Sequence, residues 1–400
     1  MRPRFGVAVA VAGLILAACG SASDANSALP STGGSANGFV HPGSVVDRAQ
    51  LQFVRDRVKA GAEPWTSASH AAEQSKYADL SAVPKPRPVV DCGSYSKPDN
   101  GCSDEIHDAV SAYTEALLWT YTGDPRRADK AVEFMDAWAV TIHDHTNSNA
   151  RVQTAWAAEI WPKAAEIVRH TSDRWPADRL ARFSDMLRTV YLPKIVDGAP
   201  RENGNWELSM IDGTMQSAVF LDDRELFDRA VAMWRNRVPT YFYLTSDGPL
   251  PLAPPGGLHD GPDKLTQYWY GQTTFVDGLA QETCRDLAHT QWGLDAASNA
   301  AETARHQGVD LYAAEQQRLT AAMEFHARYL TGTPPPDWLC GGKLNRITFE
   351  PTWEMAFNHY HSALGLDLPA TRRLLDSHRP TAVDHFLDWE TLTTADTENR

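Results

Sequence analysis

The stretch Gln281-Glu-Thr-Cys-Arg-Asp-Leu-Ala-His-Thr-Gln-Trp-Gly-Leu294 has two sharply different faces. It holds no proline and its one glycine lies near the end, so we predict a helix over the whole stretch. At about 100° per residue, one narrow arc holds Gln281, Arg285, His289 and Trp292. The opposite arc holds Ala280, Cys284, Leu287 and Leu294. If the apolar arc packs on the core, the other lines a site with an amide, a cation, an imidazole and an indole. The alternative is a structural hydrogen-bond network.

A second stretch, from Arg201 to Gln216, shows the same kind of pattern. Asn203-Gly204 indicates a turn, and Asn205 is a plausible helix cap. A polar seam then runs along an otherwise apolar helix through Asn205, Ser209, Asp212 and Gln216. Such a seam costs free energy unless it is hydrogen-bonded or faces a wet cavity. The two stretches together favour a shared cleft.

Helical periodicity continues through most of the chain. We predict helices over residues 45–60, 105–122, 125–143, 152–170, 177–195, 206–221, 224–243, 272–300, 308–330, 351–364 and 369–377. A Gly/Pro-rich loop covers residues 246–262, and no segment alternates convincingly as a strand. No repeat of fixed length is visible, which argues against a TPR or HEAT array. Antiparallel helices with short connections then favour an all-α fold, an α/α toroid in one domain over residues 41–400, with its long loops at the cleft.

The N-terminus is not expected to belong to the fold. Arg2 and Arg4 precede an apolar run that is too short for a confident membrane span and ends at Leu16-Ala-Ala-Cys19. That ending matches the bacterial lipobox, which predicts a signal peptide over 1–19, lipidation of Cys19 and a flexible tether over 20–40. The alternative is an ordinary secretory signal. We therefore expect an exported protein, lipid-anchored to the outer face of the bacterial cell membrane or secreted.

Four further cysteines predict two disulfides in an oxidising compartment. Cys92 and Cys102 flank a short turn-rich loop, so we pair them, and Cys284 pairs with Cys340 by elimination. The formal net charge of −14 argues against nucleic acid as a partner. It also means that a polyanionic substrate would need a locally basic cleft.

Several kinds of chemistry are poorly supported. No Gly-x-Ser-x-Gly elbow is present. The pairs His143/His145 and His359/His361 have the wrong spacing to share a helix face, and no His-Glu-x-x-His occurs, so we expect neither metal nor cofactor. Paired carboxylates for a glycoside hydrolase could come from Glu202, Glu207, Asp212, Asp260 or Glu282. A chain with 51 acidic residues always offers such pairs, so this signal is unspecific.

Breaking a uronic-acid polymer by β-elimination fits the residues better. The C5 carboxylate must be neutralised, which suits Asn, Gln, Arg or His, and Tyr or His can remove H5 and protonate O4. A phenol with a pKa near 10 needs a nearby cation to act as the base. The chain concentrates suitable residues within about ninety positions: Asn203, Asn205, His259, Tyr268, Tyr270, Arg285 and His289.

Three segments carry a resemblance to a known family. The segments Arg201–Asp223, Gln281–Leu294 and Trp353–Pro369 resemble, in order, motifs of the alginate-lyase superfamily of α/α toroid polysaccharide lyases. The resemblance runs from roughly His41 to Pro380. It implies that Asn203 or Asn205, with Arg285, neutralises the uronate carboxylate, and that a histidine assists.

The chain departs from the classical alginate lyases at two positions. Asn203-Gly204-Asn205-Trp206 lacks the family's histidine, and Trp292 stands where the family has a tyrosine. The acid and base are therefore expected among Tyr270, with Tyr268 as second choice, and His289. The branch that acts on glucuronan and alginate is the closer comparison.

Other residues are candidates for binding the sugar chain. They are aromatic, imidazole or amide side chains of the expected cleft and one lysine: Trp206, His259, Tyr268, Gln281, Trp292, His359, Tyr360, His361, Tyr95 and Lys97. For most of them the alternative is packing in the core; for Tyr95 and Lys97 it is a stapled turn. We predict a monomeric polysaccharide lyase acting on an anionic polysaccharide. A glycoside hydrolase or a non-catalytic glycan-binding lipoprotein remains the alternative.

Overall fold

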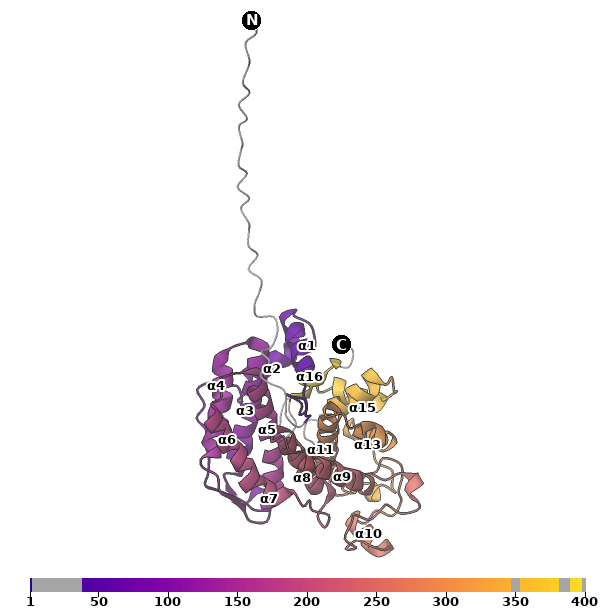
Figure 1. Ribbon diagram of the computed structural model, residues 1–400. Helices are drawn as coiled ribbons and strands as arrows, with labels where there is room; N and C mark the ends of the chain where they lie inside the picture. The colour runs from indigo at the N-terminus through magenta and orange to yellow at the C-terminus, as the bar shows by residue number, and fades with distance from the viewer. Residues whose placement is uncertain (2–37, 347–352, 381–388, 398–400) are drawn as a thin grey trace.

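The computed structural model describes residues 1, 38–346, 353–380 and 389–397 and is built mainly of helices (Figure 1). In chain order the longer helices are α1 (Arg48–Lys59), α2 (Trp65–Gln74), α3 (Cys102–Thr122), α4 (Pro125–Ala139), α5 (Ala150–Thr171), α6 (Ala177–Met186), α8 (Gly204–Phe220), α9 (Arg224–Tyr241), α11 (Leu287–His306), α13 (Gln316–Leu330) and α15 (Pro369–Asp376). The shorter ones are α7 (Leu192–Ile195), α10 (Pro262–Tyr268), α12 (Leu311–Ala314), α14 (Glu354–Phe357) and α16 (Glu390–Thr394).

The helices form two layers. Helices α3, α5, α8 and α11 pack side by side in succession, and α4 and α9 cover α3 and α8 from outside. Every residue of α8 except Trp206 is buried, as expected for a helix that is surrounded by others. The outer helix α9 has one apolar stripe instead, formed by Phe227, Val231, Trp234 and Val238. This alternation of inner and outer helices confirms the predicted α/α toroid.

The inner helices run in the same direction. Gln153 near the start of α5 donates to the carbonyl of Cys102 at the start of α3 (3.2 Å). The rings of Trp156 in α5 and Trp292 in α11 lie 5.4 Å apart near the starts of those helices. We call this end of the toroid the cleft end, and the end where the inner helices terminate the closed end. Polar groups near the N-termini of α8 and α11 thereby come together at the cleft end.

The predicted helix over residues 281–294 is wrong in its first part. Residues 281–286 form turns, and α11 begins only at Leu287. The carboxylate of Asp286 accepts a hydrogen bond from the backbone N–H of His289 (2.8 Å), which caps the helix at that residue. Gln281 and Arg285 therefore do not share a helix face with His289. Residues 272–286 are likewise not helical, and α10 lies just after the expected loop.

The expected cap of α8 is displaced by two residues. The helix begins at Gly204, with Asn203 in the cap position, and Asn205 lies inside its first turn. The backbone N–H of Gly204 donates to the side chain of Gln281 (3.0 Å), and that of Asn205 donates to Glu282 (3.1 Å). The first turn is thus capped by side chains of a distant segment, which local sequence cannot indicate.

A short sheet that the sequence did not predict lies at the cleft end. Strand β1 (Val89–Cys92) pairs antiparallel with β2 (Asp99–Asn100) and parallel with β3 (Asp144–Thr146). The sheet is tied to the start of α5, because Asn149 donates to the carbonyl of Cys92 (2.9 Å). Both predicted disulfides are confirmed: Cys92–Cys102 closes the hairpin, and Cys284–Cys340 joins the segment before α11 to a later loop.

The predicted signal peptide (1–19), with Cys19, and nearly all of the tether (20–40) lie outside the described residues. Within the described part of the chain, no helix is both long and apolar enough to cross a membrane.

Candidate active site

The side-chain amide of Asn203 is held in one orientation at the cleft end. Gly204 donates its N–H to Oε1 of Gln281 (3.0 Å), so the amide nitrogen of Gln281 must face the other way. That nitrogen donates to Oδ1 of Asn203 (3.1 Å) and to the carbonyl of Tyr268 (2.6 Å). The hydroxyl of Tyr270 donates to the same Oδ1 (3.0 Å). The Nδ2 group of Asn203 remains as a donor, and it bonds to no residue that the structure describes.

The carboxylate of Glu282 organises the second amide and the cation. It is fully buried and accepts from Nδ2 of Asn205 (2.7 and 2.8 Å) and from the hydroxyl of Tyr241 (3.0 Å). Arg285 donates to it through Nη1 (2.8 Å) and keeps 22% of its side chain exposed. Asn205 is therefore committed to a carboxylate of the protein itself. Arg285 still has N–H groups to offer to a ligand, as does Asn203.

His289 forms a dyad with Asp286. Its Nδ1 lies 2.7 Å from both carboxylate oxygens, so Nδ1 carries a proton and donates it. Burial alone would raise the pKa of Asp286, but its hydrogen bonds with His289 hold that pKa below the usual range. Trp292 packs edge-on against the imidazole, with ring centroids 4.9 Å apart. Nε2 of His289 contacts no described hydrogen-bonding group, so its lone pair is available to act as a base.

The two candidate tyrosines differ in their surroundings. Tyr268 is buried, and its hydroxyl lies between Arg237 (2.6 Å) and the carbonyl of Glu202 (2.9 Å). Burial raises the pKa of Tyr268 to about 12, although Arg237 opposes the rise. Tyr270 is 40% exposed. Burial also raises the pKa of Tyr270, Glu282 adds to the rise, and Arg285 opposes it. Both phenols are therefore protonated at neutral pH, and Tyr270 is the more exposed of the two.

Positions 204 and 293 have room only for glycine. A Cβ atom built on Gly204 would lie 1.9 Å from the ring of Tyr241, and one built on Gly293 would lie 2.4 Å from the same ring. The buried Tyr241 side chain thus occupies the space between α8 and α11 that larger residues at these positions would need. Position 204 therefore cannot carry a side chain in this structure.

Two pockets flank the tyrosines, and each contains a lysine. One of about 360 Å³ is lined by Tyr270, Lys343 and the Cys284–Cys340 disulfide. The other, of about 410 Å³, is lined by Lys264, His259 and Tyr268. The imidazole of His259 stacks on Tyr268 at 3.8 Å, and burial lowers the pKa of His259. Both lysines are exposed, and Asp337 also lines the pocket that contains Lys343.

Other predicted residues are not brought into this network. Tyr360 is fully buried and donates to the carbonyl of Tyr312 (2.9 Å), while His359 stacks on the ring of Tyr312 (4.5 Å). His361 bonds to the carbonyl of Leu366 (2.7 Å). The exposed side chains of Tyr95 and Lys97 lie at the cleft end on the β1–β2 hairpin, without a contact to the Asn203 network. Trp206, in the first turn of α8, is partly buried and packs against the core.

Among the described residues, one cluster has the composition of a metal site: His41, Glu166 and His170. It lies at the closed end, around the last turns of α5. His143 and His145 do not form a pair, since the buried His145 bonds to Glu105 (2.9 Å) instead.

Three residues that contact the site residues at the cleft end were not predicted from the sequence as parts of a lyase site. Asp286 could have been found, because an aspartate three residues before His289 is the spacing of a helix cap. Glu282 was considered only as a hydrolase carboxylate, and its role depends on the distant Asn205. Tyr241 gave no local signal, since its importance comes from the two glycines that it contacts.

Comparison with known proteins agrees with this architecture. The family model described as alginate lyase matches residues 62–253 and 263–336. Alginate lyase A1-III from Sphingomonas species A1 superposes with a TM-score of 0.61 at 16% identity, over 90% of this chain and 97% of that one. A histidine-to-alanine variant of A1-III complexed with a tetrasaccharide gives the same values. An alginate lyase from Bacteroides ovatus gives 0.56 at 13% identity, over 89% and 100%. These structures show a shared fold, and no curated protein sequence matches significantly.

Proposed function

Because this chain belongs to the alginate lyase family, and is thus a polysaccharide lyase, we propose that it cleaves a uronic-acid polymer such as glucuronan or alginate by β-elimination at the cleft end. The observation that carries the proposal is the contact of Asn203 with both Gln281 and Tyr270. It sets an amide donor and a phenol side by side next to Arg285.

Asn203 and Arg285 would neutralise the C5 carboxylate of the sugar. Removing H5 places negative charge on that carboxylate, and donors fixed in advance stabilise the charge without having to reorganise. Nδ2 of Asn203 is fixed by the two hydrogen bonds to its Oδ1. Arg285 is fixed by Glu282 and remains partly exposed. Asn205 would act indirectly, by helping to hold Glu282.

His289 would serve as the base and Tyr270 as the acid. The lone pair on Nε2 of His289 takes H5, the electrons of the C5–H bond form the C4=C5 double bond, and the C4–O4 bond breaks. The Tyr270 hydroxyl then gives its proton to O4. The raised pKa of Tyr270 keeps that proton in place at neutral pH. The products are an unsaturated uronate on one fragment and a new hydroxyl group on the other, and no water is consumed.

Local electrostatics would draw the polyanion to this end. The starts of the inner helices meet here, and helix N-termini carry partial positive charge. Lys264 and Lys343, in the two flanking pockets, add positive charge where neighbouring uronates would lie, although Asp337 lines the same pocket as Lys343.

The proposal is tested by incubating the purified protein separately with glucuronan, polymannuronate, polyguluronate and hyaluronan. We expect ultraviolet absorbance from unsaturated uronate to rise with one of them, and this result names the substrate class. New reducing ends without that absorbance would instead indicate a glycoside hydrolase. Binding without either signal would indicate a glycan-binding protein. This alternative arises because the chain lacks the family's histidine and tyrosine.

Attachment to a membrane is a separate proposal. The lipobox ending at Cys19 supports lipid anchoring of an exported protein, and the two disulfides are typical of an oxidising compartment. Cys19→Ser should release the protein from the membrane fraction, which detergent partitioning would measure. A variant that stays in the detergent phase would contradict lipidation.

A further inference from the structure

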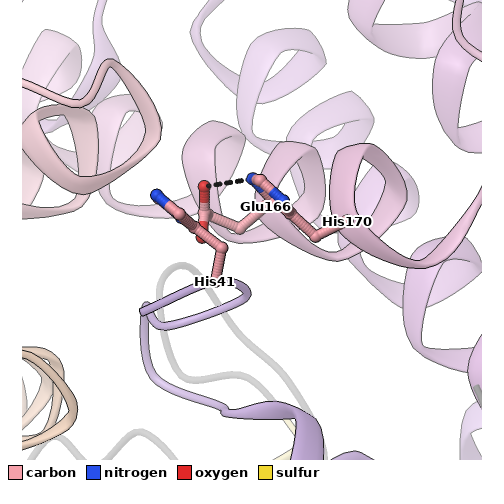
Figure 2. Close-up of side chains that lie close together, drawn as sticks. All are labelled: His41, Glu166 and His170. Carbon is pink, nitrogen blue, oxygen red and sulfur yellow. Dashed lines mark hydrogen bonds and ion pairs between the residues drawn. The ribbon is translucent and has the colours of Figure 1, made fainter. Parts of the chain in front are cut away.

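Two imidazoles and a carboxylate meet at the closed end of the toroid. The network around Asn203 and Glu282 lies at the other end, the cleft end. Figure 2 shows His41, from the segment before α1, lying against Glu166 and His170 of α5. Glu166 and His170 are four residues apart, which puts them on the same face of the helix. All three side chains are buried, with 2%, 0% and 8% exposure, and one ligand atom from each lies within 4.8 Å of the others.

Part of this cluster has no hydrogen-bond partner. Neither ring nitrogen of His170 makes a hydrogen bond among the described residues, and neither does Oε1 of Glu166. Nε2 of His170 and Oε1 of Glu166 form an i,i+4 ion pair at 3.5 Å, drawn as a dashed line in Figure 2, without the alignment of a hydrogen bond. Two ligands of a tetrahedral metal ion, with bonds of about 2.1 Å, lie about 3.4 Å apart. The spacing of these two atoms is therefore also that of two ligands of one ion.

His41 completes the set of ligands. Its Nδ1 lies 2.9 Å from Oε2 of Glu166, and its Nε2 lies 3.0 Å from Asp222. A neutral imidazole carries a proton on one ring nitrogen only, so it can donate to one of these two carboxylates. The other ring nitrogen must carry either an additional proton or a metal ion. Metal-bound histidines commonly donate their second ring nitrogen to a carboxylate, which is the role that Asp222 fills here.

We propose that His41, Glu166 and His170 bind a divalent transition-metal ion of the zinc class, which fastens the N-terminal segment to the end of α5. His170 lies in the last turn of that helix, where the partial negative charge of the C-terminus favours a cation. The rings of His41 and His170 now stack in parallel at 4.3 Å, so one ring must turn about its Cβ–Cγ bond to present its nitrogen to the ion. This torsion is broad for histidine.

The test is metal binding by the purified full chain after treatment with a chelator. We expect one equivalent of Zn²⁺ to bind, and Co²⁺ in the same site to give the visible absorption of a tetrahedral ion. We also expect Zn²⁺ to raise the unfolding temperature, because an ion that binds only the folded state stabilises it. Failure of the wild-type protein to bind either ion in equilibrium dialysis would overturn the proposal without affecting the proposed lyase activity.

Variants separate this site from adventitious binding. His170→Ala should abolish the cobalt absorption, and Asp222→Asn should weaken binding by about 10–100-fold through the orientation of His41. Residue 222 has a φ of 58°, in the left-handed region, which asparagine tolerates better than most residues, so this substitution should not strain the backbone. The matched control is His70→Ala, an exposed histidine of α2, which should bind as the wild type does. Undiminished binding by folded His170→Ala and Asp222→Asn proteins would place the ion elsewhere and overturn the proposal.

Discussion

Each end of the toroid holds a buried carboxylate beside cationic or imidazole groups, but the two ends differ in where unused hydrogen-bonding capacity points. At the cleft end both oxygens of Glu282 are satisfied within the protein, and the spare groups belong to partly exposed neighbours such as Asn203 and His289. At the closed end the atoms without a hydrogen bond belong to the buried Glu166 and His170, which form an ion pair with each other. Hydrogen-bonding groups at a solvent-facing edge can bind a polymer that approaches from outside. Buried ligand atoms that face one another can bind a single ion.

The direction of the inner helices reinforces this difference. Their N-termini meet at the cleft end, which favours the uronate carboxylates that we propose as ligands. At the closed end, Arg169 donates to the carbonyl of Phe220 (2.6 Å), so α5 and α8 terminate together there. Substitutions of the partly exposed groups at the cleft end, such as Asn203 and His289, should therefore mainly change turnover, and those of buried groups at the closed end should mainly change stability.

The largest effect on turnover is expected from His289→Ala. Loss of the base should lower kcat by about 10²–10⁴-fold, whereas the free energy of unfolding should fall only by about 1–3 kcal/mol, because the buried Asp286 loses one partner. Only the hydrogen bonds with Asp286 and the packing on Trp292 are lost. Steady-state ultraviolet assays and denaturant unfolding measure both quantities. A folded variant with wild-type turnover would remove His289 from the reaction.

The two asparagines should separate catalysis from structure. Asn203→Ala should lower kcat by roughly 10²–10³-fold, because it removes a donor to the developing charge. Asn205→Ala should instead lower the free energy of unfolding by about 1–3 kcal/mol, since it takes donors from the buried Glu282. Kinetics and denaturant unfolding of both variants provide the comparison. A larger kinetic loss in a fully stable Asn205→Ala protein would reverse their roles.

At the closed end, Glu302→Gln should reduce stability but not turnover. Glu302 is buried and pairs with Arg305 (2.6 Å) and His306 (3.3 Å). Breaking these pairs should lower the free energy of unfolding by about 3 kcal/mol. The control is Asp178→Asn, which breaks an exposed pair with Arg182 and should cost less than about 1 kcal/mol. Equal losses in the two variants would contradict a buried, stabilising network at this end.

The stability that Glu302 contributes at the closed end should depend on pH. Burial alone would raise the pKa of Glu302, but Arg305 and His306 outweigh burial and lower it. A carboxyl group whose pKa is lower in the folded than in the unfolded state contributes stability above the unfolded value, near 4.3, and loses it as the pH falls. Acid titration of the unfolding free energy should show this loss in the wild type and a smaller one in Glu302→Gln. Identical acid profiles would exclude the contribution.

The smallest expected effect is the position of the alkaline limit of activity. Tyr270 must be protonated to act as the acid, and its pKa is raised. Turnover should therefore fall only above the ordinary tyrosine pKa of about 10. The residual activity of Tyr270→Phe should lack that limb, whereas Tyr329→Phe, on the outer helix α13, should keep it. Wild-type turnover that rises with pH through this range would make Tyr270 the base.

The sequence predicted the toroid and both disulfides because these depend on local patterns: helical periodicity, turn residues and cysteine spacing. It also predicted that Asn203, Gln281 and Arg285 belong to one site, although it placed Gln281 and Arg285 on a helix that in fact begins at Leu287. The boundary was missed because residues 281–286 are held by contacts to the start of α8, about 77 residues away.

Other features could not be obtained from local patterns. Glu282 differs from the other acidic residues only in its contacts with Asn205, Tyr241 and Arg285. His41 and Glu166 are 125 residues apart, so no local pattern connects them. Tyr360 resembled a binding residue because a motif contained it, but burial places it in the core.

The most direct test of β-elimination at the cleft end is the mass of the oligosaccharides released from whichever polymer the wild-type protein cleaves. Elimination consumes no water, so we expect every new non-reducing end to be unsaturated and each such fragment to be lighter by one water than a hydrolysis product. Fragments with saturated ends and the mass of a hydrolysis product would contradict the assignment of Asn203, Tyr270 and His289 to a lyase mechanism.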